Sequence, residues 1–162
     1  MTQPRSRTFS WSDPLATAAA ARDLPGLEAI RAIAAGELPP PPIAELLDFE
    51  IAHVEPGRVV FAIEPAEWMY NPIGSVHGGV AATLLDSSLG CAIHTVLEAR
   101  ARYTTTDLHV RYVRAMTADT GRVLADSRVV HVGRKLATAE GRLYAEADEK
   151  LFAHATTSCL IL

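Results

Sequence analysis

The chain has 162 residues, of which 49% are hydrophobic and 6% aromatic, and its formal net charge is −4. These values predict one globular domain, and the lack of a basic, aromatic-rich block argues against nucleic acid as a partner. Cys91 and Cys159 lie in apolar segments without metal-ligand spacing or a disulfide framework, so we expect two buried thiols.

Residues 1–25 are expected to form an extension. Asp13 and Pro14 precede an alanine-rich run. Because Asp accepts the free amides of a first helical turn and Pro suits the first helical position, a short helix is predicted there. The alanine run is too short and too weakly apolar to span a bilayer, and no apolar run of signal-peptide length is present, so we expect a cytoplasmic protein that does not bind membranes.

The main domain is expected over residues 26–162. A short helix is predicted at residues 27–35, and the four prolines at residues 39–42 predict a stiff, extended spacer. Two strands are predicted at residues 46–55 and 58–65, on either side of a Pro-Gly turn.

A long helix follows a loop and contains a single acid, Asp86, between residues 80 and 97. A helix that is apolar nearly all round is buried on every side. The simplest arrangement wraps a curved antiparallel sheet around it and seals the remaining face against another subunit. Four further strands with alternating polarity are predicted at residues 104–116, 122–131, 136–147 and 151–162.

This order of two strands, one helix and four strands resembles the hotdog fold. The pattern Asn71-x2-Gly74-x2-His77-Gly78-Gly79-x6-Asp86 resembles the PaaI-type acyl-CoA thioesterases within that fold, and the resemblance covers residues 26–162. It implies an α+β hotdog domain, an acyl-CoA substrate, no cofactor or metal, and a homodimer that can pair into a tetramer.

The glycines at the start of the long helix are candidates for stabilising the oxyanion. First-turn amides have no partner within a helix and lie at the positive end of its dipole. We therefore expect the Gly78 N–H to meet the negative charge that grows on the thioester carbonyl oxygen, with Gly79 contacting substrate. The alternative is a tight turn into the helix without a catalytic role.

Asp86 is the candidate nucleophile or general base. It lies eight residues beyond Gly78, which is about 12 Å along a helix, so one carbonyl cannot meet both groups of the same chain. Two subunits with antiparallel helices across a two-fold axis would bring Asp86 of one to Gly78 of the other, and the resemblance implies the same arrangement. The alternative is that Asp86 caps a structural element or pairs with an arginine of the partner.

The resemblance assigns supporting roles to His77, Asn71 and a threonine of the strand after the helix. His77 would hold the loop and approach the thioester, and Asn71 would orient the nucleophile or water. Both residues could instead only brace the loop through side-chain hydrogen bonds. Alignment favours Thr105 near the carboxylate, although a shift of one residue would select Thr104 or Thr106.

Coenzyme A carries phosphates, and Arg134 with Lys135 in a predicted turn is the best candidate pair for binding them. A solvated turn explains the pair equally simply. No Gly-x-Ser-x-Gly motif supports a serine hydrolase, and Asp86 and His94 are too far apart along a helix to hold one metal. Two rival functions remain: a hotdog hydratase or dehydratase, and a non-catalytic acyl-CoA-binding module.

Overall fold

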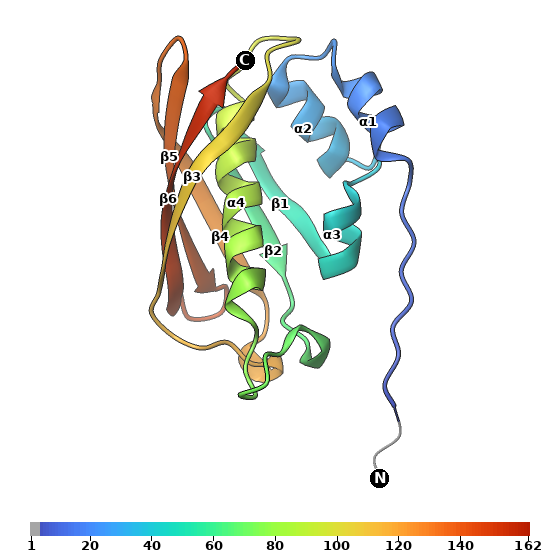
Figure 1. Ribbon diagram of the computed structural model, residues 1–162, viewed down its shortest axis with the longest axis vertical. Coiled ribbons are helices and arrows are strands. Elements are labelled where there is room, and N and C mark those ends of the chain that lie inside the picture. The colour runs from blue at the N-terminus through green and yellow to red at the C-terminus, as the bar shows by residue number, and fades with distance from the viewer. Residues whose placement is uncertain (1–3) are drawn as a thin grey trace.

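Six antiparallel strands form one curved sheet against a central helix in the computed structural model, which describes residues 4–162 (Figure 1). The predicted order of two strands, one long helix and four strands is confirmed. Across the sheet the order is β1-β2-β4-β5-β6-β3. The elements are α1 (Pro14–Ala21), α2 (Gly26–Ala34), α3 (Pro42–Leu47), β1 (Phe49–Glu55), β2 (Arg58–Ile63), the 3-10 turn η1 (Glu67–Met69), α4 (Gly78–His94), β3 (Tyr103–Tyr112), the 3-10 turn η2 (Ala118–Thr120), β4 (Val123–Val132), β5 (Leu136–Ala145) and β6 (Leu151–Ile161).

The central helix α4 packs one side on the sheet. Its sheet-facing leucines Leu84, Leu85 and Leu89 are at most 1% exposed. The prediction that the sheet covers this side is confirmed. On the opposite side a stripe stays half-buried, so the helix of a single chain is not covered all round; the stripe comprises Ala82, Thr83, Asp86 and Ser87.

Helices α2 and α3 lie beside α4 and β1, and α1 lies on the outer side of α2 (Figure 1). The predicted cap of α1 is confirmed, since Asp13 Oδ1 accepts from the Leu15 N–H at 2.9 Å, and α1 buries none of its residues. The start of α2 is pressed onto the end of α4. A Cβ at Gly26 would lie 1.8 Å from the His94 carbonyl oxygen, so only glycine allows this approach.

The helix α3 was not predicted, and the expectation of an extended spacer at residues 39–42 is wrong at its last residue. Pro42 begins α3, because proline needs no N–H in a first helical turn and its φ is already helical. Asp48 then ends the helix in the left-handed conformation, with φ 58°. The first strand therefore starts at Phe49 and not at residue 46.

The strand after the helix is also shorter than predicted, since β3 ends at Tyr112 and not at residue 116. The N–H groups of Val113 and Arg114 both donate to the Phe152 carbonyl, at 2.7 and 3.1 Å. One acceptor that serves two successive donors cannot continue a regular ladder, so the chain leaves the sheet at this point.

Candidate active site

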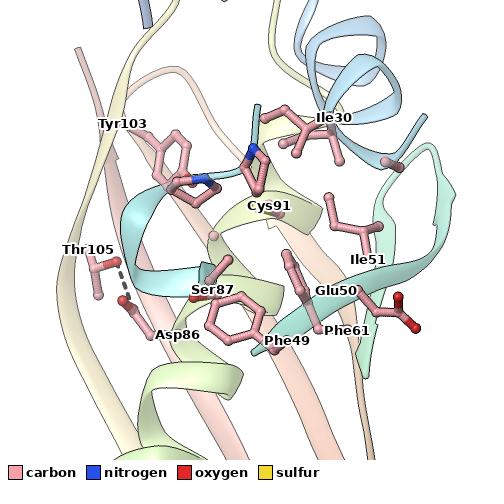
Figure 2. A pocket seen from close by; sticks show the side chains of 16 residues that line it. Ile30, Phe49, Glu50, Ile51, Phe61, Asp86, Ser87, Cys91, Tyr103 and Thr105 are labelled. Carbon is pink, nitrogen blue, oxygen red and sulfur yellow. Dashed lines mark hydrogen bonds between the residues drawn. The ribbon is translucent and has the colours of Figure 1, made fainter. Parts of the chain in front are cut away.

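Asp86 and Thr105 come together between α4 and β3. The Thr105 hydroxyl donates to Asp86 Oδ1 at 3.1 Å, and both residues are half-buried (Figure 2). The other carboxylate oxygen, Oδ2, accepts no hydrogen bond from any side chain or backbone N–H of residues 4–162. The carboxylate is thus held on one side and free on the other.

A β-bulge in β3 decides which threonine faces Asp86. Thr105 pairs with Cys159, and Asp107 pairs with Ser158, so Thr106 is an extra residue without a partner position. The exposed Thr106 turns its hydroxyl to the Ser158 carbonyl at 2.9 Å, and Thr104 is exposed as well. Of the three threonines, Thr105 is therefore the one next to Asp86.

A cavity of about 420 Å³ opens beside Asp86 and Thr105 (Figure 2). Its walls are mostly apolar and come from β1, β2, α4 and the start of β3, and α2, α3 and the segment between these two helices form its roof. Sequence reasoning missed this roof. The signal was present in α2, where Ala29, Ile30 and Ala32 are buried in a helical pattern, but the segment after it was read as a spacer.

Ionisable groups near the cavity other than the carboxylates are held neutral. Burial raises the pKa of the Cys91 thiol to about 12, and the Asp86 charge adds to this. Burial also raises the pKa of the Tyr103 phenol well above its usual value, and it lowers the pKa of His94. Cys91 is therefore a poor nucleophile at neutral pH, although it lines the cavity and is only half-buried.

Gly78 is the first residue of α4, and its N–H has no acceptor within the described part of the chain. The Gly79 N–H is already used, because it donates to His77 Nδ1 at 2.9 Å. His77 is thus the N-cap of α4. The structure leaves Gly78, and not Gly79, as the free donor at this helix end.

Tyr112 lies against Gly78. Its hydroxyl donates to the Gly78 carbonyl at 3.0 Å, and a Cβ at Gly78 would lie 3.2 Å from Cζ of the ring. A close contact within the chain is thus one reason for glycine at this position. Sequence analysis did not single out Tyr112, because β3 carries no pattern that marks its last residue.

Gly78 and Asp86 of one chain do not share a cavity. Gly78 lines a second cavity, of about 330 Å³, together with Tyr112, Arg114 and Met116, and no residue lines both cavities. This agrees with their separation of about 12 Å along α4. The candidate reacting carboxylate and the candidate oxyanion donor therefore lie at two different places of one chain.

Asn71 is occupied within its own loop. Its Oδ1 accepts from the N–H groups of Ile73 and Ser75, at 3.0 and 3.3 Å, and its Nδ2 donates to Ser75 Oγ at 3.1 Å. This geometry matches the alternative in which Asn71 braces the loop before α4. The structure does not bring Asn71 to Asp86 of the same chain.

Arg134 and Lys135 lie exposed in the β4–β5 turn, close to the C-terminus and at the opposite end of α4 from Gly78 (Figure 1). Neither residue forms an ion pair with another residue of the range 4–162. Neither lines the cavity of Asp86 or that of Gly78.

No three His, Cys, Asp or Glu side chains of residues 4–162 cluster in a way that could hold a metal ion. No helix in the described range has the length and apolar character needed to cross a bilayer.

Comparison with known proteins identifies relatives of this chain. A sequence model of the thioesterase superfamily matches residues 73–152. An esterase-named protein of Halobacterium salinarum is 40% identical over 77 residues, which are 46% of this chain and 49% of that protein, so the match spans about half of its length. A 1,4-dihydroxy-2-naphthoyl-CoA hydrolase of Listeria monocytogenes is 24% identical over 109 residues, which are 67% of this chain and 87% of that protein.

Among solved structures, a thioesterase described as related to phenylacetic acid degradation, from Ralstonia eutropha, superposes with a TM-score of 0.72. It is 28% identical, and the alignment covers 81% of this chain and 98% of that one. The residues that the family model matches include Asp86 and Thr105. Residues 73–152 therefore match the thioesterase superfamily, and the chain has the hotdog fold.

Proposed function

We propose that the protein hydrolyses the thioester of an acyl-CoA to the free acid and CoA. The observation that carries this proposal is the Asp86 carboxylate, held at 3.1 Å by the Thr105 hydroxyl beside a cavity with mostly apolar walls. An acyl group would lie in the cavity with its carbonyl carbon next to the free oxygen of Asp86. The match of residues 73–152 to the thioesterase superfamily supports thioester hydrolysis in general.

Two routes start from this geometry. In one, Asp86 attacks the carbonyl carbon, the C–S bond breaks, CoA leaves as the thiolate, and water hydrolyses the resulting mixed anhydride. In the other, Asp86 takes a proton from a water whose oxygen attacks the carbonyl carbon directly. In both routes the developing oxyanion needs donors, and removal of one such donor typically costs 10²–10³-fold in rate.

The N–H group that donates a hydrogen bond to the oxyanion is proposed to come from a second subunit. The free Gly78 N–H lies about 12 Å from Asp86 in the same chain, so it cannot serve the same carbonyl. β3 is an edge strand of ten residues with one unpaired side. A cytoplasmic homodimer that pairs two β3 strands about a two-fold axis would run two α4 helices antiparallel and bring Gly78 of one towards Asp86 of the other.

The same arrangement gives Arg134 and Lys135 a proposed role. In an antiparallel pair, the β4–β5 turn of one subunit lies at the end where the other subunit's α4 begins. Two exposed cations without ion pairs to residues 4–162 suit the CoA phosphates there. Replacing both with Ala should raise KM for acyl-CoA but not for a short pantetheine thioester, and the difference should shrink at high salt.

Mixing two inactive variants tests the shared site. Asp86→Asn lacks the reacting carboxylate, and Gly78→Pro lacks the N–H at the first helical position, where proline is tolerated. Gly78→Ala is the matched control, because it adds a similar contact with Tyr112 but keeps the N–H. If each site takes Asp86 and Gly78 from different subunits, the mixture should recover about a quarter of wild-type activity, since half of the dimers are mixed and each has one intact site of two.

A thiol-release assay with a panel of acyl-CoAs decides the function itself. Full turnover by Asp86→Asn would refute the role of Asp86, and no recovery on mixing would refute the shared site. Tight acyl-CoA binding by the wild type without any release of CoA would instead favour the non-catalytic binding module.

A further inference from the structure

The cavity beside Asp86 contains a second polar group that the proposed chemistry does not use, the hydroxyl of Tyr103. Tyr103 lines the cavity, and its hydroxyl makes no hydrogen bond to any group of residues 4–162. No completely buried side-chain oxygen in that range lacks a partner, so the Tyr103 hydroxyl keeps accessible surface. An unpartnered hydroxyl at the wall of a ligand-sized cavity is available to a ligand.

Helix α4 and strand β3 contact each other at the wall of the cavity, at two levels along the helix. At the first level, Asp86 meets Thr105. At the second, Gly90 meets Tyr103, and a Cβ on Gly90 would lie 2.9 Å from the Tyr103 hydroxyl oxygen. Gly90 follows Asp86 by four residues, or about 6 Å along the helix, and Tyr103 precedes Thr105 by two residues, or about 7 Å along the strand.

The position and protonation of the Tyr103 hydroxyl are both fixed. The ring packs edge-on against His94, with centroids 5.5 Å apart, and Gly90 leaves the space that the hydroxyl occupies. Because burial raises its pKa well above the usual value, the phenol stays protonated and can donate. The cavity walls are mostly apolar, with Ile30, Phe49 and Phe61 among them (Figure 2).

We propose that Tyr103 determines specificity by hydrogen bonding an oxygen substituent that the acyl group carries about five bonds beyond the thioester carbonyl carbon. The proposal rests on the function proposed above, which places that carbonyl at Asp86. An extended chain advances about 3.3–3.6 Å per three bonds, so roughly five bonds cover the 6–7 Å between the two levels. A ring hydroxyl opposite the carbonyl and a chain hydroxyl on the fifth carbon both meet this condition.

Matched substrate pairs test the proposal. The pairs are 4-hydroxybenzoyl-CoA with benzoyl-CoA, and 5-hydroxyhexanoyl-CoA with hexanoyl-CoA. The wild type should prefer the oxygenated member of at least one pair, and Tyr103→Phe should lower that preference in kcat/KM about tenfold, through loss on the oxygenated member alone. The pair that responds tells whether the acyl group is a ring or a chain.

Two control variants make the result specific to Tyr103. Tyr144→Phe removes a phenol hydroxyl from β5, outside the cavity, and should leave both preferences unchanged. Ser87→Ala removes the other hydroxyl of the cavity wall next to Asp86. The proposal is overturned if Tyr103→Phe lowers both members of each pair equally, if it leaves the preference intact, or if Ser87→Ala alone abolishes it.

Failure of this inference differs from failure of the proposed function. If the wild type cleaves both members of each pair equally well and Asp86→Asn cleaves neither, the function stands and the role of Tyr103 is refuted. If the wild type cleaves none of the four acyl-CoAs, the hydrolysis proposal fails. The role of Tyr103 is then tested by calorimetry, which compares the affinities of wild type and Tyr103→Phe for the same four acyl-CoAs. Equal affinities would then refute the role of Tyr103.

Discussion

The two sides of α4 show how one helix can combine stability and chemistry. On the sheet side, Leu85 and Leu89 are fully buried, and Ser88 is satisfied by Ser127 Oγ at 2.6 Å. On the cavity side, Asp86 keeps one oxygen without a partner among residues 4–162, and neighbouring small residues leave space unfilled. Packing is complete where the helix supports the fold, and it is incomplete where a ligand is proposed to bind.

Residues of the two sides alternate within one or two positions of the sequence, so substitutions at neighbouring positions should affect different properties, either turnover or stability. Changes on the cavity side should alter turnover and leave the free energy of unfolding nearly unchanged. Changes on the sheet side should lower the free energy of unfolding and leave the turnover of folded molecules nearly unchanged. Each variant below is a test of this division.

The largest effect is expected for Asp86→Asn on the cavity side. Loss of the reacting carboxylate should lower kcat about 10³-fold, whichever of the two routes operates. The melting temperature should not fall, because the half-buried carboxylate has only the Thr105 hydroxyl as a partner among residues 4–162. Thiol release and thermal unfolding of the same sample measure both quantities.

Asp107→Asn is the matched control, since it removes a half-buried carboxylate from β3 that does not line the cavity. It should retain wild-type turnover. A clear drop in the melting temperature of Asp86→Asn would contradict the division, because it would make Asp86 a structural residue.

The next effect is expected for Leu89→Ala on the sheet side. Leu89 is 0% exposed, and truncation of a buried leucine typically costs about 2–5 kcal/mol of stability through lost burial and the cavity left behind. Urea unfolding measures the loss. The folded fraction should keep its kcat/KM for acyl-CoA within about a factor of two, since the removed atoms face the sheet and not the site. A loss below 1 kcal/mol, or a large drop in turnover, would contradict this expectation.

A smaller loss of stability is expected for Ser88→Ala. This change leaves the fully buried Ser127 Oγ without its only hydrogen-bond partner in the described range, which should cost about 1–3 kcal/mol. The double variant Ser88→Ala with Ser127→Ala removes both hydroxyls and should recover part of the loss. Urea unfolding of the two single variants and the double variant gives the coupling, and strict additivity would show that the pair does not interact.

The smallest effect is expected for Thr105→Val, which keeps the side-chain shape and removes the hydroxyl next to Asp86. Without its donor the carboxylate loses its orientation, and kcat should fall about tenfold, as expected for one hydrogen bond to a charged group. Thr106→Val is the control, since its hydroxyl bonds the Ser158 carbonyl on the exposed strand edge. Equal turnover of the two variants would remove Thr105 from the site.

Local patterns allowed much of the fold to be predicted. Asp13 before Pro14 marked the start of α1, because capping depends on residues next to each other in the sequence, and Gly78 with Gly79 marked the start of α4. The His77 cap was not predicted. The strands could be predicted as well, because the alternation of inward and outward residues is also a pattern of neighbouring residues in the sequence. The helical rise alone predicted that Gly78 and Asp86 of one chain lie apart.

Features that depend on distant contacts escaped prediction. The resemblance favoured Thr105 near the carboxylate, but the bulge at Thr106 was not predicted, and a shift of one residue reverses the faces of a strand. The cavity roof depends on the packing of α2 against α4 at Gly26. This is a contact between segments far apart in the sequence. The sequence left open whether Asn71 orients the nucleophile or water, or only braces its loop. The hydrogen bonds of Asn71 to Ser75 and Ile73 could be identified only in the structure.

The roof over the cavity is encoded before residue 48, whereas the Asp86–Thr105 pair lies inside the segment shared with the thioesterase superfamily. Exchange of the early segment should thus change which acyl group the proposed site admits, while the carboxylate and its threonine stay as they are. The determinants of the proposed acyl group are therefore expected among the residues that precede the shared segment.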